Sequence, residues 1–353
     1  MSTEKPFAIS YNQKVAEVLT SLRCTLAIST YQAGKVIFLG SDNGRTLFQI
    51  PVGFRKPMGI ALLNKKMAVA TIDEIQIYGA SRSIGNQLSG IDGSYDKLYL
   101  PRATYYSGGL DLHDVGFGKG GLWAVNTRFS CIATFDINNS FTPRWKPTFI
   151  TELKPQDRCH LNGMAMVDQK PAYVSALSQT NTPAGWREDI TNSGVLMTVP
   201  NGEMILENLP MPHSPRIIDG KLYLLLSASG ELVRVDVENK SYETVVKVNG
   251  FIRGMAAHKN YVFIGLSKVR KSSKTFGKLP VSEMADHAGV LVYDLLNNEK
   301  IGMIKYNSTV EEIYDVQILP DTAKPGLISV SDERHSSAIV IDEKVFVNKT
   351  KKT

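Results

Sequence analysis

The sequence predicts an all-β protein, a six-bladed β-propeller whose N- and C-terminal segments share the closing blade. The first observation is a repeated unit, made of a polar residue, a short apolar strand, a turn and a second strand. The second is the spacing of the copies, roughly 40 to 60 residues, which is typical of four-stranded propeller blades. The third is that strand-like segments near the two ends of the chain complement each other into one further blade.

The innermost strand of each blade is the clearest part of the repeat. The best copy is Asn162-Gly163-Met164-Ala165, which a turn at 167–171 joins to a second apolar run, Ala172–Leu177. Short runs of this kind, bounded by turn residues, are typical of paired β-strands. Equivalent inner strands are expected at Met58–Ala61, Asp114–Phe117, Pro215–Ile218, Arg253–Ala256 and Asp315–Ile318.

Third and fourth strands complete the expected blades. The third strands are β-rich runs bounded by Gly, Asn and Asp. They are expected at Ile75–Tyr78, Ile132–Phe135, Val195–Thr198, Leu232–Val235 and Val290–Tyr293. Fourth strands are more polar, because they form the outer edge of a blade. They are expected at Thr148–Ile150, Met204–Leu206, Thr244–Val246 and Ile301–Ile304.

The two ends of the chain are predicted to close the ring. A short helix at Asn12–Ser21 is followed by three strands that have no inner strand of their own. These strands are Thr25–Ser29, Lys35–Gly40 and Thr46–Val52. The segment Asp315–Leu319, near the other end, supplies the missing inner strand, and closure leaves no sheet edge exposed.

The predicted boundaries follow from this closure. We expect an N-terminal arm and short helix at 1–21, one propeller domain at 22–343 and a basic tail at 344–353. A seven-bladed ring is the alternative, because Leu327–Val330 and Ala338–Ile341 offer two further strands.

Composition limits the classes of function. No apolar run approaches the roughly 20 residues that cross a membrane, and the N-terminus lacks the pattern of a secretory signal. The three cysteines are too few for a disulfide framework, so we expect a cytoplasmic protein without a membrane partner. The net charge of +6 comes partly from the tail and from a basic segment between 268 and 278. Because no nucleic-acid-binding motif accompanies this charge, we do not expect a nucleic-acid partner.

Candidate site residues lie where the inner strands begin, because these strand starts converge at one mouth of a propeller channel. Imidazole, carboxylate and guanidinium groups are concentrated there. The expected catalytic residues are His160, His213, His113 and Asp114. The expected substrate-binding residues are Arg55, Arg216, Arg253, Asn162, Glu312 and Asp315.

Two chemistries remain open for this mouth. In one, His160, His213 and Asp114 hold a divalent metal, a donor set that suits zinc, manganese or iron, and the metal polarises a carbonyl or activates water. In the other, a histidine is the general acid or base and arginines bind an anionic substrate. Either chemistry predicts an enzyme of lyase, hydrolase or isomerase type that acts on a small anion.

A structural interpretation is open as well. The polar inner ring would then hydrate the channel and satisfy loop backbone groups, and the propeller would be a non-catalytic scaffold that binds a ligand or a protein. Long connections at 80–110, 178–193 and 268–287 could cap one end of the channel or bind a protein partner.

Several motifs resemble a bacterial family of uncharacterised propeller proteins. They are Ser29–Lys35 (with Thr-Tyr-Gln-Ala-Gly-Lys), Arg55–Ala61, His160–Ala165 and Tyr314–Pro320, and they span about residues 20 to 320. This family implies a fold and no biochemical role. The segment Asn162–Ala165 is also similar, more loosely, to the metal-binding Asn-Gly strand of gluconolactonase-type and strictosidine-synthase-like six-bladed propellers. The lactonase pattern requires carboxylates where this chain has Met58 and Arg253, so we do not transfer the activity.

Overall fold

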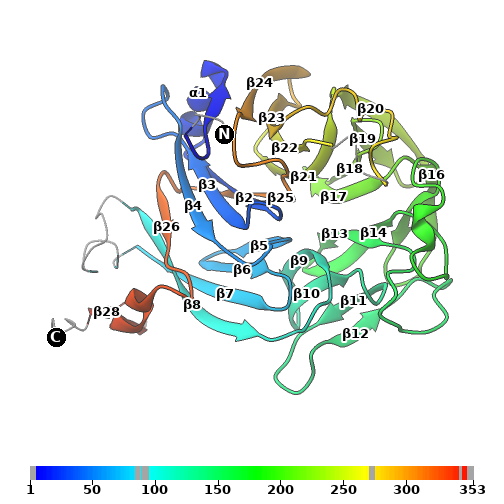
Figure 1. The fold of residues 1–353 in the computed structure, drawn as a ribbon, viewed down its shortest axis with the longest axis horizontal. Coiled ribbons are helices and arrows are strands. Elements are labelled where there is room, and N and C mark those ends of the chain that lie inside the picture. The colour runs from blue at the N-terminus through cyan, green and yellow to red at the C-terminus, as the bar shows by residue number, and fades with distance from the viewer. Residues whose placement is uncertain are drawn as a thin grey trace.

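Six four-stranded antiparallel blades surround a central axis in the computed structural model (Figure 1). The structure describes residues 5–82, 84, 88, 95–269, 275–341 and 344–347. The six-bladed all-β prediction is confirmed. The inner strands contact one another in a closed ring. In ring order they are β5 (Ile60–Leu63), β9 (Leu112–Gly118), β13 (Leu161–Val167), β17 (Pro212–Ile218), β21 (Phe251–His258) and β25 (Asp315–Leu319).

Each inner strand is followed outward by three further strands. The β5 blade adds β6 (Lys66–Ala70), β7 (Ile75–Ser81) and β8 (Lys97–Tyr105); the β9 blade adds β10 (Gly121–Asn126), β11 (Cys131–Thr134) and β12 (Thr142–Trp145). The β13 blade adds β14 (Lys170–Ala176), β15 (Gly194–Thr198) and β16 (Met204–Leu209); the β17 blade adds β18 (Lys221–Leu226), β19 (Glu231–Asp236) and β20 (Ser241–Lys247). The β21 blade adds β22 (Tyr261–Ser267), β23 (Ala288–Asp294) and β24 (Glu299–Tyr306); the β25 blade adds β2 (Thr25–Thr30), β3 (Lys35–Gly40) and β4 (Phe48–Gly53).

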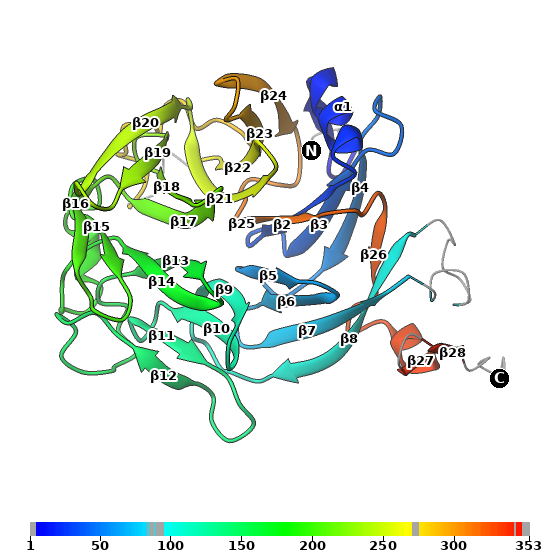
Figure 2. The ribbon, with the colours of Figure 1, turned by 180° about the vertical axis from the view of Figure 1, so that it is seen from behind.

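The shared blade joins the two ends of the chain. Strand β25 pairs antiparallel with β2, with Asp315 opposite Ser29 and Leu319 opposite Thr25, as the sequence predicts. Figure 2 shows β25 entering the blade between β2 and the axis. This pairing removes the open edge that β2 would otherwise present.

The hydrophobic core is divided among the interfaces between blades. One cluster, for example, joins Leu225 and Leu232 of one blade to Ile252, Val262 and Leu291 of the next. Both faces of most strands are therefore buried, and every residue of β23 is buried. This explains why many strands are continuous apolar runs rather than alternating ones.

Three segments differ from the sequence-based expectation. The connection 80–110 contains β8, the fourth strand of its blade, so it is not a loop throughout. The fourth strand of the β9 blade is β12 and not Thr148–Ile150. The arm before the predicted helix includes β1 (Ile9–Tyr11), which pairs with β24.

The seven-blade alternative is wrong, because the final strands build no blade. Strand β26 (Pro325–Leu327) adds in parallel to the outer edge of β8. Beyond the 3₁₀-turn Glu333–Ser337, β27 (Ala338–Ile341) and β28 (Lys344–Val347) pair with each other and with no other strand among the described residues. Figure 2 shows this hairpin at the periphery, outside β8.

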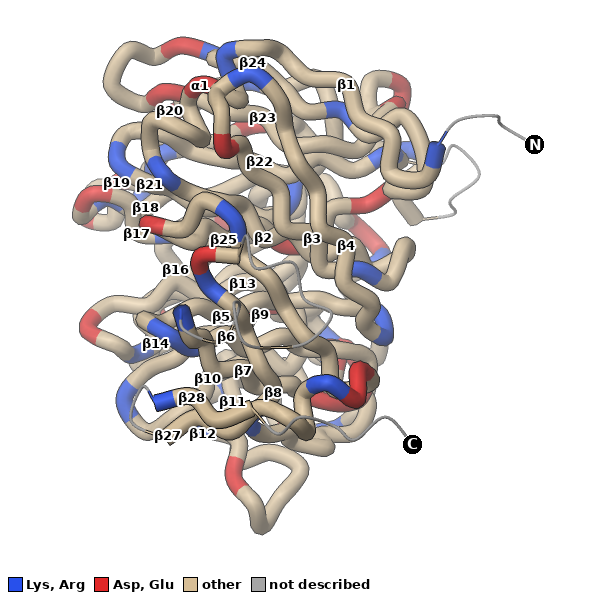
Figure 3. Tube along the Cα trace, turned by 90° about the vertical axis from the view of Figure 1, so that its left-hand side faces the viewer, with Lys and Arg blue, Asp and Glu red and all other residues tan. Residues whose placement is uncertain are grey.

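The outer surface carries the remaining elements and the charge. Helix α1 (Gln13–Ser21) buries Val15, Val18 and Leu19 beside β3 and β24. No helix in the described ranges is long and apolar enough to cross a membrane. Figure 3 shows Lys and Arg interspersed with Asp and Glu around the blades. Arg270, Lys271, Lys274 and residues 348–353, which belong to the basic segments noted above, lie outside the described residues.

Candidate functional site

Three histidines stand at the starts of three successive inner strands. His113 is the second residue of β9, His160 immediately precedes β13, and His213 is the second residue of β17. The rings of His113 and His160 meet edge to face, with centroids 4.7 Å apart. The repeat thus places one imidazole per blade at the same level of the ring.

His113 is held by its Nδ1 atom. Nδ1 lies 3.0 Å from the carbonyl oxygen of Asp111 and 2.9 Å from Oγ1 of Thr127. The Thr127 hydroxyl in turn donates to the carbonyl of Leu161 in the next blade at 2.6 Å. Burial lowers the pKa of His113 well below its usual value, and the neighbouring His160 and Arg253 lower it further.

His213 repeats this arrangement one blade beyond His160. Its Nδ1 lies 3.0 Å from the carbonyl oxygen of Met211 and 2.9 Å from Oγ of Ser227. Ser227 donates to the carbonyl of Ile252, again in the next blade, at 2.6 Å. Burial lowers the pKa of His213 well below its usual value, and the charge of Arg253 adds to this effect.

His160 is held by a carboxylate instead. Its Nδ1 lies 3.0 Å from each oxygen of Asp157, and Trp186 donates its indole N–H to Asp157 at 2.9 Å. The Trp186 ring also packs on the imidazole, with centroids 4.2 Å apart. Trp186 belongs to the 3₁₀-turn Gly185–Arg187 in the connection 178–193. This connection therefore fixes the orientation of both the imidazole and its carboxylate.

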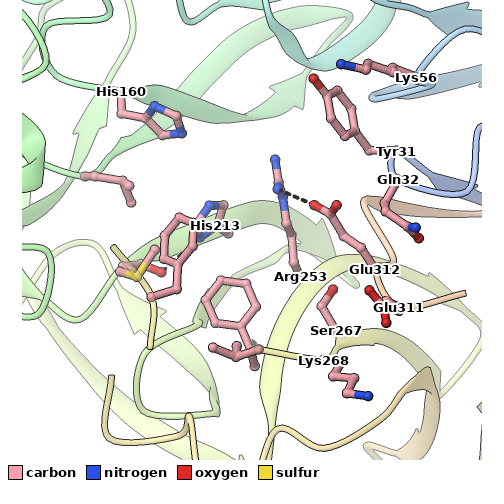
Figure 4. A pocket seen from close by; sticks show the side chains of 15 residues that line it. Tyr31, Gln32, Lys56, His160, His213, Arg253, Ser267, Lys268, Glu311 and Glu312 are labelled. Carbon is pink, nitrogen blue, oxygen red and sulfur yellow. Dashed lines mark hydrogen bonds and ion pairs between the residues drawn. The ribbon is translucent and has the colours of Figure 1, made fainter. Parts of the chain in front are cut away.

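A pocket of about 500 Å³ opens beside these rings. His160 and His213 lie on one side of it, Tyr31 and Lys56 lie across from them, and Arg253 extends between the two sides (Figure 4). The other lining residues are Gln32, Leu177, Met211, Phe251, Ser267, Lys268, Val269, Phe276, Glu311 and Glu312. The volume is that of a site for a small molecule.

Arg253 extends into this pocket from β21. The flat face of its guanidinium covers the ring of Tyr314 at 3.5 Å from the centroid, and Tyr314 stacks on Tyr31. One guanidinium nitrogen lies 3.6 Å from Glu312. Stacking occupies the face of the guanidinium and leaves its N–H edge directed sideways, the geometry that a carboxylate or phosphate requires.

A second polar cluster lies deeper on the axis. Arg216 forms a bidentate ion pair with Asp114, at 2.7 and 3.2 Å, and lies 3.6 Å from Asp315. Asp114 also accepts the N–H of Met164, and Asp315 accepts the N–H of Ile60. Each carboxylate thus connects its inner strand to the next blade. Burial raises the pKa of Asp315 to about 6, against the opposing effect of Arg216.

The residues expected from the sequence are therefore divided. His160, His213, Arg253 and Glu312 line the pocket, and His113 backs His160. Asp114, Arg216 and Asp315 form the axial cluster. Asn162 bridges Ser175 and the carbonyl of Pro212. Arg55 is exposed and pairs with Asp73.

The expected metal-binding set is not assembled. Asp114 accepts hydrogen bonds from Arg216 and from the backbone N–H of Met164. In the described ranges, no three or more His, Cys, Asp or Glu side chains gather as metal ligands would.

Sequence reasoning missed Asp157, Trp186 and Tyr31, and the two hydroxyls that hold His113 and His213. One signal was available: Thr127 and Ser227 each follow their histidine by the same interval, in two copies of the repeat. No comparable signal marks Asp157, because its role depends on the turn before β13.

The fold and the pocket define a six-bladed propeller with a histidine-lined site at one mouth. The chain belongs to the family described as a domain of unknown function (DUF4915), whose model matches residues 13–328. No curated protein matches the sequence.

Two solved structures share the fold. One is titled as the crystal structure of a nidogen/laminin complex, with a TM-score of 0.52, 10% identity, and coverage of 84% of this chain and 99% of that one. The other is a protein of unknown function from Bacteroides caccae, with a TM-score of 0.50, 11% identity, and coverage of 84% and 98%. At these identities the likeness shows the fold alone.

Proposed function

We propose that the protein binds a small anionic molecule in the mouth pocket and transfers a proton on it, as a lyase, hydrolase or isomerase does. One observation carries the proposal: an imidazole backed by a carboxylate, His160 on Asp157, faces the same pocket as the stacked guanidinium of Arg253. The pair supplies a base and the guanidinium supplies a site for an anion.

Arg253 is suited to hold the anion. A guanidinium has five N–H donors, and the packing of its face on Tyr314 fixes the direction in which they point. Lys56 and Lys268 add positive charge to the lining, and Glu311 and Glu312 add negative charge. Because the pocket is not uniformly basic, binding depends on the one oriented guanidinium more than on a general field.

His160 is suited to transfer the proton. Asp157 accepts from Nδ1, so Nε2 is the nitrogen left to act on a ligand, as in other carboxylate-backed imidazoles. Trp186 fixes the carboxylate and packs on the ring. His213 lines the same pocket as a neutral second imidazole.

The test is a thermal-shift screen of small carboxylates and phosphate esters. Anions that raise the melting temperature of the wild type should lose this effect in Arg253→Gln. The same anions should still raise the melting temperature of Arg234→Gln. This variant is a matched control, because Arg234 on β19 forms an ion pair with Glu243 on β20. Each anion that binds is then assayed for turnover with the wild type and with His160→Asn. Anions that bind equally well to Arg253→Gln would contradict the proposal.

Protein binding at the rim is a second candidate. The β27–β28 hairpin exposes Ile339, Ile341 and Phe346 by 45, 57 and 52%. Exposed apolar side chains of this size are typical of interaction surfaces. Changing all three to Ser should abolish partner capture and leave anion binding unchanged. Partner capture that survives the triple change would contradict this candidate.

A further inference from the structure

We infer that the anion taken by the mouth pocket is hydroxylated, as a sugar acid, a small hydroxy acid or a sugar phosphate is. The inference rests on the proposed function and adds the chemical class of the ligand. It follows from the direction of the hydrogen bonds that His113, His160 and His213 make, because these bonds leave the rings with acceptors for a ligand.

The partner of each Nδ1 determines which ring nitrogen carries the proton. The carbonyl oxygens of Asp111 and Met211 can only accept, so Nδ1 of His113 and of His213 must donate to them. The Thr127 and Ser227 hydroxyls donate their protons to carbonyls of the next blade, so each hydroxyl oxygen must accept from Nδ1 of its histidine.

His160 follows the same rule through Asp157. Both carboxylate oxygens lie 3.0 Å from Nδ1, and an ionised carboxylate is an acceptor only. In a neutral imidazole with a proton on Nδ1, the other nitrogen has a lone pair. None of the three Nε2 atoms has a hydrogen-bond partner within the part of the chain that the structure describes.

Burial keeps two of these rings neutral. The pKa of His113 and of His213 lies well below the ordinary value, chiefly because of burial. At neutral pH their Nε2 atoms therefore accept hydrogen bonds and do not donate them. A ligand that meets His213 must supply a donor.

A hydroxyl is the donor that fits this site. Arg253 lowers the pKa of both His113 and His213 through its charge, so the same charge also opposes an ammonium group placed there. A hydroxyl donates without adding charge. Tyr31 and Phe251 also contribute aromatic rings to the lining, which suits the C–H groups of a polyol chain.

Two acceptors from different blades imply more than one hydroxyl. His160 and His213 both line the pocket, and Arg253 extends beside His213 into the middle of the same space (Figure 4). An acid bound at Arg253 by its carboxylate or phosphate would extend its hydroxylated chain toward them. The volume of about 500 Å³ accommodates a six-carbon acid.

The experiment compares matched anions with and without hydroxyls by isothermal titration calorimetry. The carboxylate pairs are D-galactonate with hexanoate and glycerate with propionate. The phosphate pair, glycerol 3-phosphate with propyl phosphate, distinguishes the two kinds of anion. All titrations contain EDTA. We expect the hydroxylated member of at least one pair to bind about tenfold more tightly or better, because an unpaired buried acceptor is costly.

Histidine variants assign that preference to the rings. In His213→Phe the ratio within the preferred pair should fall below about threefold, with affinity for the plain acid retained. His160→Gln, at a less buried ring, tests the same point if His213→Phe does not fold. His258→Gln is the control, because His258 lies at the far end of β21 and is not among the pocket residues.

The outcomes separate the two proposals. Anions that bind through Arg253 with no preference for hydroxyls would overturn this inference and leave the proposed function standing. A preference for 6-aminohexanoate over D-galactonate would also overturn it, because the donor would then be an ammonium. Binding of D-galactonate only when EDTA is replaced by Zn²⁺ would show that the lone pairs hold a metal, again against the inference. If no anion binds, the proposed function fails as well.

Discussion

Replacing Arg216 by Met tests the role of the axial cluster. The change leaves the carboxylates of Asp114 and Asp315 near one another without their shared cation. Their side chains are only 6 and 5% exposed, and that of Arg216 is 18% exposed. Removing one partner of a buried ion pair costs about 3–5 kcal/mol, because the remaining charge stays desolvated.

The expected size of the thermal shift follows from the length of the chain. An unfolding entropy of about 2.1 cal/mol/K per residue gives roughly 0.7 kcal/mol/K for 353 residues. A loss of about 3–5 kcal/mol therefore lowers the melting temperature by about 4–7 °C. Arg234→Met is the control. Because Arg234 pairs with Glu243 at the surface, we expect that change to cost under about 1 kcal/mol.

The pH dependence distinguishes buried charge from lost packing. The pKa of Asp315 is about 6 in the folded protein, above its ordinary value of 3.8. Between these two pKa values the folded state binds a proton on Asp315 that the unfolded state has released. The contribution of Asp315 to stability therefore falls as the pH rises through 6. Without Arg216, which lowers this pKa, the fall should extend to higher pH. The deficit of Arg216→Met should thus grow from pH 5 to pH 8 in differential scanning calorimetry. A deficit that is independent of pH would refute the role assigned to the cluster.

Three further predictions concern other parts of the molecule. Gly254→Ala should destabilise the protein more than Gly220→Ala, because a Cβ at Gly254 would lie 2.8 Å from Cα of Asp315, whereas nothing lies within 4 Å of a Cβ at Gly220. Gly220→Ala should cost about 1–2 kcal/mol for its left-handed backbone alone. Equal melting temperatures of the two variants would contradict this prediction. The three cysteine thiols are buried, and burial raises the pKa of each to about 12. A thiol reagent at pH 8 should therefore modify them only in denaturant, and rapid labelling of the native protein would count against the buried placement. Asp157→Ala should weaken D-galactonate about tenfold by releasing the His160 ring and leave hexanoate within twofold, as measured by calorimetry; an unchanged ratio would exclude Asp157 as a positioning residue.

Much of the fold could be predicted because the repeat is local. Inner strands such as Asn162–Ala165 carry their pattern in consecutive residues, and the unmatched strands at both ends imply the shared blade. Strand β8 could not be predicted in this way. It follows a long connection, and its sequence, which includes Pro101 and Arg102, has the composition of an outer edge rather than of a buried strand. The segment Leu327–Val330, which the sequence offers to a seventh blade, overlaps β26 only at Leu327, because the parallel pairing of β26 with β8 is not local.

The sequence predicts where the site lies, but it predicts only some of the residues that form it. Strand starts converge in any propeller, so His160, His213 and Arg253 could be expected together. The direction in which each side chain points within that ring could not be predicted from the sequence. Asp114 and His113 are adjacent in the chain, yet one bonds across the axis to Arg216 and the other is held by Thr127. Asp157 and Trp186 reach His160 from irregular connections, whose conformation no periodic pattern specifies.

Long-range ¹H–¹⁵N correlation NMR of protein labelled at histidine nitrogen tests the central claim most directly. The rings, assigned by single His→Gln variants, should show a protonated Nδ1 and an unprotonated Nε2 at pH 7.5 in His113 and His213, and a proton on Nδ1 in His160. Adding D-galactonate should shift the Nε2 signals of His160 and His213 and leave that of His258 unchanged. Protonated Nε2 atoms of His113 and His213 in the free protein, or shifts that are absent at saturating D-galactonate, would contradict the account of the site as an acceptor-lined pocket for a hydroxylated anion.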